Sequence, residues 1–315
     1  MTRNSSPSRL TFALVAFTAL AGLELSNPAE AKVRHLNKSE PVAVAPQYDT
    51  THVYVAPDDV DAFATSFLAT FGGTTTKQVV VTVTPTPSST TSQLLQTPVG
   101  TVSLFGFKTG IPTPFGAERT GYLVTDLDKA IMAARLAGAD VIVSPFPDPI
   151  GRDAVVQWPG GVNMQLYWHN TKPNYAAFQT VPENRVYVSP DRADTFIKCF
   201  LAFSKGKVTS DDKAAPGAEI GQPATTYRRV RIDSAFGRMT VLVTNGHLTY
   251  PYGHELTGYQ VSDLGATLAK ARSAGAQILV APYRSADRDA AMVEFPGGYV
   301  AEIHAALSSG AAPSN

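Results

Sequence analysis

The chain has 315 residues, and its 26 basic residues (Lys and Arg) balance 26 acidic ones, so the formal net charge is zero. This balance argues against a nucleic-acid partner, because such proteins usually present a basic surface. The single cysteine, Cys199, excludes an internal disulfide bond and a metal site made of several cysteines. The length is typical of about two domains.

Residues 1–31 have the three parts of a secretory signal peptide. Two arginines precede a mostly apolar stretch from Leu10 to Leu25, and Ala29-Glu30-Ala31 is a small-x-small cleavage site. We expect cleavage before Lys32 and a periplasmic or secreted protein, with an uncleaved anchor as the alternative. The apolar stretch is short for a membrane span, so no membrane anchor is expected after cleavage. Residues 32–47 lack periodicity and are expected to form a flexible lead-in.

The rest of the chain is an internal duplication. The segment that opens with Thr120-Gly121-Tyr122 recurs, with matched spacing, from Thr257-Gly258-Tyr259. An earlier segment, Val53-Tyr54-Val55, recurs as Val186-Tyr187-Val188. We therefore expect a first module over residues 48–170, a linker over 171–180, a second module over 181–307 and a disordered tail over 308–315.

Each module is predicted to contain two βαβββ units. In the first unit, a strand over 53–55 precedes a helix that starts at Asp58 and ends at Gly72, and strand-like runs follow over 78–83, 93–98 and 101–107. In the second unit, a strand over 122–124 precedes a helix capped by Asp126 and stopped by Gly138. Strands over 141–143, 154–158 and 162–167 complete that unit. Four such units in the chain predict an α+β fold.

The order and spacing of these segments resemble the vicinal oxygen chelate superfamily, which includes glyoxalase I, extradiol dioxygenases and bleomycin-resistance proteins. The matching segments are 124–130, 137–141 and the Pro-Gly-Gly turns, and with their repeats they span nearly the whole chain after the signal peptide. The resemblance implies a glyoxalase-like fold in which tandem βαβββ units form two curled mixed sheets, each around a cleft. It also implies a small oxygenated organic substrate or ligand. In catalytic members a divalent metal (Zn, Ni, Fe or Mn) lies on the concave face.

The resemblance places metal ligands near the start of each unit's first strand and in its last strand. In the first module, His52 and Gln165 hold two of these positions. The other two fall near Ser103 and near Arg119 or Thr120, which are not normal ligands. Two candidate donors hold a catalytic metal poorly, since such sites use at least three protein ligands. A divalent metal and no metal at all therefore stay open as alternatives.

The second module departs further from the pattern. Glu302 holds the glutamate position, and His304 has the same strand parity, so both are expected to face the cleft. Arg185 stands where His52 stands in the first module. An arginine cannot ligate a metal, so Arg185 becomes a candidate for substrate binding.

Other candidates each have two interpretations. Glu118 and Glu255 recur in both copies, either as bases or ligands at a cleft mouth or as acceptors of backbone hydrogen bonds. Arg152-Asp153 and Arg288-Asp289 look like a recurring pair, in which the arginine either clamps an anionic substrate or pairs with an acid on the surface. The cluster Arg228-Arg229-Arg231 is interpreted as a solvated face. The candidate aromatic walls of a substrate cleft, which core packing would explain equally well, are Tyr54, Tyr122, Tyr187 and Tyr259.

Two hypotheses of function follow. The first is an exported, metal-dependent lyase, isomerase or dioxygenase, with His52 and Gln165 as ligands and Glu118 as a third donor or base. The second is a metal-free protein that binds and sequesters a small molecule in one or both clefts. A third possibility is that the second module is purely structural and closes the sheet edges of the first. Both hypotheses expect a small-molecule partner, and the fusion of two modules is compatible with a monomer.

Overall fold

A computed structural model describes residues 41–246, 248, 255–285 and 287–307. The expected signal peptide, most of the expected lead-in and the expected tail lie outside the described residues. The last residues of the lead-in lie against the first module. Val42 is buried, Ala43 forms a β-bridge with Val124, and a short 3-10 helix, η1 (Pro46–Tyr48), follows.

The first sheet has nine strands in the order β2-β4-β5-β1-β6-β9-β8-β7, with β3 paired to β4. Because β1 pairs in parallel with β5 and antiparallel with β6, the sheet is mixed, and this seam joins its two βαβββ units. Its strands are β1 (Thr50–Val55), β2 (Thr74–Thr75), β3 (Val79–Val81), β4 (Thr90–Thr97), β5 (Gly100–Phe107), β6 (Thr120–Leu123), β7 (Asp140–Asp148), β8 (Gly151–Trp158) and β9 (Val162–His169).

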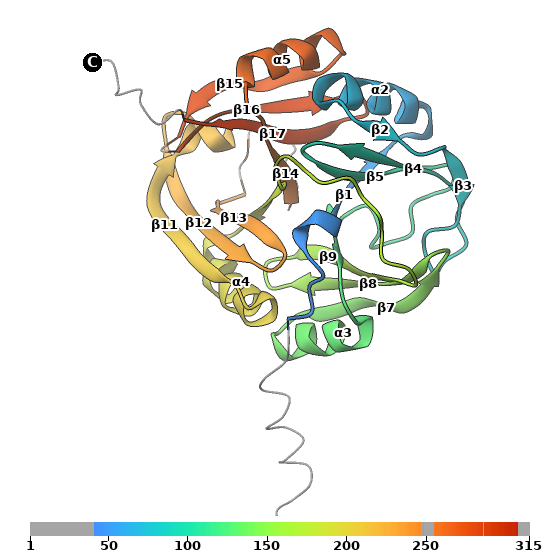
Figure 1. The fold of residues 1–315 in the computed structure, drawn as a ribbon. Coiled ribbons are helices and arrows are strands. Elements are labelled where there is room, and N and C mark those ends of the chain that lie inside the picture. Colours follow the sequence, from blue (N-terminus) through green and yellow to red (C-terminus); the bar gives the residue numbers. More distant parts are fainter. Residues whose placement is uncertain (1–40, 247, 249–254, 286, 308–315) are drawn as a thin grey trace, which may run out of the picture. The chain divides into compact units, whose positions relative to one another are not determined.

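The second sheet repeats this arrangement with eight strands in the order β11-β12-β13-β10-β14-β17-β16-β15. The prediction of four βαβββ units that form two mixed sheets is therefore confirmed (Figure 1). The strands are β10 (Glu183–Val188), β11 (Lys207–Pro216), β12 (Thr226–Ser234), β13 (Gly237–Val243), β14 (Glu255–Gln260), β15 (Gln277–Arg284), β16 (Arg288–Phe295) and β17 (Tyr299–Ala306).

One helix belongs to each unit, and its ends follow local rules. The side chain of Asp126 accepts a hydrogen bond from the Lys129 amide, as its prediction as a helix cap required, and Asp263 does the same for Ala266. The first helix begins at Val60, because a short 3-10 turn, η2 (Pro57–Asp59), precedes it. The helices are α2 (Val60–Phe71), α3 (Leu127–Leu136), α4 (Pro190–Ser204) and α5 (Leu264–Ser273).

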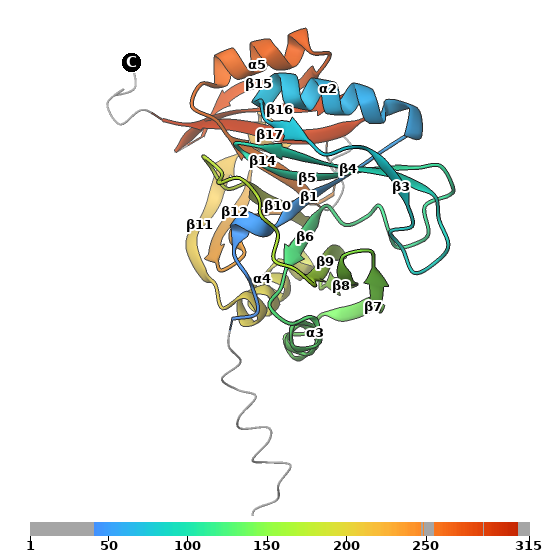
Figure 2. The ribbon, with the colours of Figure 1, turned by 45° about the vertical axis from the view of Figure 1, so that its right-hand side comes forward.

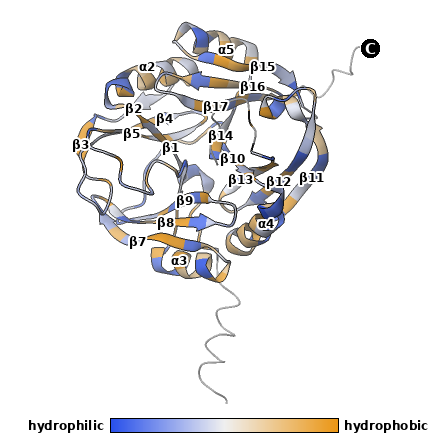
Figure 3. Ribbon diagram, turned by 180° about the vertical axis from the view of Figure 1, so that it is seen from behind, coloured by the Kyte–Doolittle hydropathy of each residue, from blue (hydrophilic) through white to orange (hydrophobic). Residues whose placement is uncertain are grey.

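The helices pack across the two modules. α2 lies beside α5, and α3 beside α4 (Figure 2), so each of the two large hydrophobic cores combines one unit from each module. In one core, for example, the ring of Phe67 lies 5.3 Å from that of Phe295. Hydrophobic and hydrophilic stretches alternate along the helices, as one buried face requires (Figure 3). Both cores lie on the helix side of the sheets, which leaves the opposite, concave faces for a site.

None of the helices in the described ranges combines the length and the apolar character needed to span a membrane.

Candidate functional site

A cavity of about 300 Å³ lies on the concave face of the first sheet. This volume is at the lower end of the range that is typical of small-molecule sites. Its lining comes from both units of the module, so the seam between β1 and β6 crosses its floor. Residues from strands on its floor include Thr50, His52, Tyr54, Ser103, Phe105 and Gln165.

His52 and Gln165, the two predicted metal ligands of this module, both line the cavity. They flank Gly121, which lies opposite Thr50 on β1 and opposite Gln165 on β9. A Cβ atom on Gly121 would lie 2.5 Å from Nε2 of His52. The glycine therefore gives the imidazole the space in which it lies, and no side chain from β6 stands between the two predicted ligands.

The donor set does not fit a catalytic metal. From the sequence, a ligand position was expected near Arg119 or Thr120. The structure places Gly121 of β6 at that position, opposite Gln165, so no side-chain donor occupies it. Ser103, opposite His52 on β5, adds only a hydroxyl. Within the described ranges, no group of three or more His, Cys, Asp or Glu side chains is arranged to hold a metal ion. One imidazole and one amide fall short of the three protein ligands that catalytic sites use.

Glu118 lies behind the cavity wall, where it connects Tyr54 and His52. It is fully buried, accepts a hydrogen bond from the Tyr54 hydroxyl and has its Oε1 4.0 Å from Nδ1 of His52. Burial and then the Glu118 charge raise the pKa of Tyr54 well above its ordinary value, so the phenol stays protonated. Glu118 is thus placed to position Tyr54 and lies close to His52, and it is not itself among the residues of the lining.

Glu255 occupies different surroundings from its repeat partner. It is buried where the two modules meet, and its Oε2 accepts the backbone N–H of Arg119 at 3.0 Å. Burial raises the pKa of Glu255 to about 7. The carboxyl holds a loop of the other module, which matches the interpretation as an acceptor of backbone hydrogen bonds.

Three other predicted substrate-binding residues lie away from the cavity. Tyr122 and Tyr259 point into the cores on the helix side, where their hydroxyls bond to Asn184 and Tyr299. Arg152 lies at the surface, where it forms a two-pronged pair with Asp128 at 3.0 and 3.1 Å. For these three residues the packing or surface interpretation holds. Tyr54 is the one tyrosine of the four whose ring lines this cavity.

The acidic side of the cavity was not predicted from the sequence. Asp153 on β8 and Asp148 at the end of β7 both line it. Asp153 is only 6% exposed, and burial, followed by the charge of Asp148, raises its pKa well above the ordinary value. The available signal was alternation in β8, which puts Asp153 on the same face as the apolar residue Val155.

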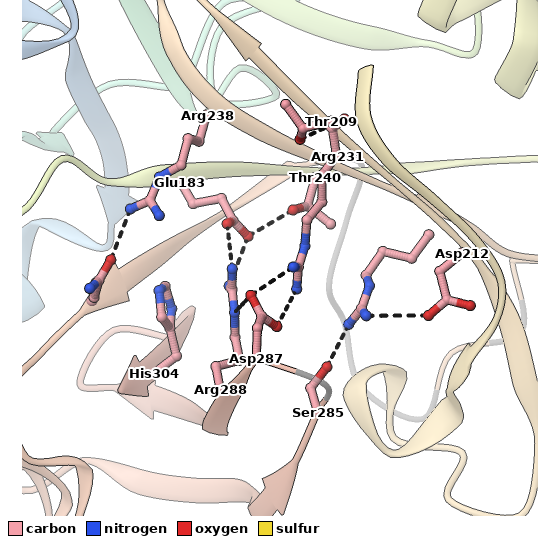
Figure 4. A network of polar contacts seen from close by, with 12 residues as sticks. Glu183, Thr209, Asp212, Arg231, Arg238, Thr240, Ser285, Asp287, Arg288 and His304 are labelled. Carbon is pink, nitrogen blue, oxygen red and sulfur yellow. Dashed lines mark hydrogen bonds and ion pairs between the residues drawn. The ribbon is translucent and has the colours of Figure 1, made fainter. Parts of the chain in front are cut away.

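The second sheet has its own charges on the concave face. Arg185 is completely buried and contacts Glu302, so the two residues at metal-ligand positions pair with each other. Figure 4 shows Arg288 bound to Glu183, which also accepts a hydrogen bond from Thr240 at 2.8 Å. Three guanidinium groups and three carboxylates are buried in this network: Arg185, Arg229, Arg288, Glu183, Glu219 and Glu302.

The network corrects two interpretations of the sequence. Arg229 is 3% exposed and bonds to Glu219 on the 3-10 helix η3 (Gly217–Ile220), so it is not part of a solvated face. Arg288 is the counterpart of Gly151, not of Arg152, because each opens its strand, so the two Arg-Asp pairs are out of register by one residue. His304 joins the network with Nδ1 3.0 Å from Glu302, and burial lowers its pKa to about 3.

These charges make the second module unlike a metal site. The positive charge at its centre belongs to the guanidinium group of Arg185, a side chain of the protein itself and not a bound ion. Burial opposes ionisation of Glu183, but the neighbouring Arg288 outweighs it and holds the pKa of Glu183 well below its ordinary value. The network contains three guanidinium groups and three carboxyl groups, and each of these buried acids has a basic partner.

No family model and no curated protein matches the sequence. Among solved structures, a mutant of 4-hydroxymandelate synthase from Streptomyces coelicolor is similar, with a TM-score of 0.58 and 14% identity over 87% of this chain and 95% of that chain. A Mn(II)-bound glyoxalase from Novosphingobium aromaticivorans has a TM-score of 0.51 and 14% identity over 85% of this chain and 84% of its own. A mutant of homoprotocatechuate 2,3-dioxygenase from Brevibacterium fuscum has a TM-score of 0.53 and 13% identity over 84% and 72%.

At these identities the likeness concerns the fold. The chain has the tandem vicinal oxygen chelate fold, as the sequence resemblance predicted.

Proposed function

We propose that this protein binds a small organic molecule in the cavity of the first module without the help of a metal ion. The second module serves as a structural partner whose concave face is closed by its own charges. One observation carries the proposal: the first module keeps a cavity of about 300 Å³ at the position of the family's cleft, but only His52 and Gln165 of the family's ligand positions carry a usable donor.

The second candidate is a metal-dependent lyase, isomerase or dioxygenase. It is favoured by the position of His52 and Gln165, which lie on the first and last strands of one module and line the same cavity. Such an enzyme needs at least one further protein ligand. Glu118 does not supply it easily, because it bonds to Tyr54 behind the wall.

Metal content separates the two candidates. Residues 32–315 are purified without chelator, as wild type and as His52→Ala, and analysed by elemental mass spectrometry. The binding proposal expects no stoichiometric transition metal in either protein. About one metal ion per chain in the wild type, lost in His52→Ala, would replace the binding proposal with the enzymatic one.

We also propose that the protein acts outside the cytoplasm. The support is the tripartite signal in residues 1–31, with its cleavage site before Lys32. Expression of the full chain, followed by cell fractionation and N-terminal sequencing, tests it. A soluble product outside the cytoplasm that begins at Lys32 is expected, whereas an intact N-terminus in the cytoplasm would contradict export.

A further inference from the structure

The cavity of the first module has acidic side chains in its lining. Its lining includes two carboxylic acids, Asp148 and Asp153. Among the described residues that line it, none is Lys or Arg. Asp148 accepts a hydrogen bond from the Ile150 amide at 3.0 Å, so it is held within its own turn.

Asp153 is different, because its carboxylate has no partner. It is 6% exposed, and no hydrogen bond or ion pair joins its side chain to any residue in the described ranges. Every buried carboxylate of the second module's network, in contrast, faces a guanidinium group. A buried acid without a partner is costly, so it calls for an explanation, and a ligand that supplies the missing partner is one.

Asp153 also has no acidic counterpart in the second module. Asp153 lies opposite Tyr167 on β9, and its counterpart in the second sheet is Ala290, which lies opposite His304. At this position the duplication therefore has a carboxylate in the first module and an alanine in the second. This distribution is what a ligand-binding role predicts, whereas a role in folding would be expected in both copies.

Aromatic rings form another part of the cavity lining. The ring of Tyr54 lies 5.3 Å from that of Phe105, and Tyr167 stands next to Asp153 on the neighbouring strand. Aromatic faces attract organic cations, with the strongest effect where water is excluded. Apolar side chains from β3 and β4, including Val81 and Leu94, line the cavity as well.

We propose that the ligand of this cavity is an organic cation, an amine or a quaternary ammonium compound with an apolar or aromatic body. Its charged end lies against Asp153 and Tyr167, and its body packs against Phe105, Leu94 and Val81. The inference rests on the proposed function of the same cavity and names its class of ligand. Burial holds the pKa of Asp153 high, so a cation also supplies the charge that favours its ionised form.

The experiment compares three probes of one size and different charge: benzylammonium, benzyl alcohol and benzoate. Their affinities are measured by calorimetry at pH 8 for the wild type, for Asp153→Asn and for Asp140→Asn. Asp140 is exposed on β7 and serves as the matched control. We expect benzylammonium to bind at least about tenfold more tightly than benzyl alcohol, a difference of ~1.4 kcal/mol, with benzoate weakest.

The variants and the neutral probe separate the preference for a cation from the binding function itself. Asp153→Asn should abolish the preference for the cation but keep the binding of benzyl alcohol, and Asp140→Asn should change neither. Equal or tighter binding of benzyl alcohol by the wild type would overturn the cation proposal and leave the binding function standing. Failure of all three probes to bind, at millimolar concentrations, would count against the binding function itself.

Discussion

Arg185 occupies on β10 the position that His52 occupies on β1. His52 lies opposite Ser103, and Arg185 lies opposite the related residue Thr240. Both side chains pass over a glycine of the neighbouring strand, at Gly121 and Gly258. One duplication has thus produced an imidazole beside a cavity in one module and a buried guanidinium group at the centre of an ion network in the other.

Removal of Arg185 should destabilise the protein strongly. Arg185→Leu leaves Glu302 and Glu219 buried without this partner, and breaking a buried ion pair costs about 3–5 kcal/mol. The free energy of unfolding is measured by urea denaturation. Arg152→Leu, which removes the surface pair with Asp128, is the control and should cost less than ~1 kcal/mol. Equal effects of the two variants would show that the buried network contributes little.

A methyl group on Gly121 should disturb the cavity through His52. The new Cβ would lie 2.5 Å from Nε2 of His52 and 3.0 Å from Cε1 of Tyr167, so the rings must move, at a cost of roughly 1–3 kcal/mol. At Gly258 the nearest atom, Cδ of Arg185, is 3.3 Å away, so Gly258→Ala should be milder. In a His52→Ala background Gly121→Ala should cost less than in the wild type. If Gly121→Ala has the same cost in both backgrounds, the clash does not involve His52.

Glu255 should make the protein less stable as the pH rises. Its pKa is about 7 in the folded state and near 4.5 in the unfolded chain. Between these values the folded state binds the extra proton, so its contribution to stability falls as the pH increases from 4.5 to 7, by at most ~3 kcal/mol. Other groups act in the same range: His304, with a folded pKa of about 3, contributes in the opposite direction up to pH 6.5.

The comparison with Glu255→Gln isolates this effect, because glutamine keeps an acceptor for the Arg119 amide. The difference in unfolding free energy between the variant and the wild type should grow in favour of the variant as the pH rises from 4.5 to 7. A difference that stays constant across this range would mean that Glu255 is ionised in the folded protein.

The binding of a permanent cation should depend on the ionisation of Asp153. Because the pKa of Asp153 is raised, the affinity for benzyltrimethylammonium should increase with pH until the carboxyl is ionised. The charged or titratable groups that face it are Asp148, Tyr167 and His169, and burial lowers the pKa of His169. Calorimetric titrations from pH 5 to 8 provide the measurement. Asp153→Asn should show a flatter profile, and an identical profile would assign the dependence to another group.

The fold could be predicted from the sequence because the duplication repeats the same order and spacing of segments. The matched spacing of the Thr-Gly-Tyr and Pro-Gly-Gly segments places corresponding strands in corresponding positions, and the cap at Asp126 has its equivalent at Asp263. The faces of the strands were harder to predict. Tyr122 and Tyr259 each follow a glycine that occupies the concave face, and glycine has no side chain to reveal which face is polar.

The site was only partly predictable for a related reason. His52 and Gln165 were found through the family pattern, which fixes positions on strands. The buried charges depend on partners that are distant in sequence, since Arg288 binds Glu183, 105 residues away. Alternation alone cannot distinguish a solvated arginine from one such as Arg229, whose partner Glu219 lies on a 3-10 helix. Asp153 was overlooked because the neighbouring Arg152 suggested an ion pair that does not form.

Metal-free binding in the first module's cavity is tested most directly by titrating chelator-treated wild type with benzylammonium, with and without added Mn²⁺. Ser103→Phe is titrated in the same way. Ser103 lines the cavity, so phenylalanine should fill it, and Ser210→Phe on the exposed edge strand β11 is the matched control. We expect the same affinity with and without the metal, loss of binding in Ser103→Phe and no change in Ser210→Phe. Binding that appears only with Mn²⁺, or that survives in Ser103→Phe, would contradict metal-free binding in this cavity.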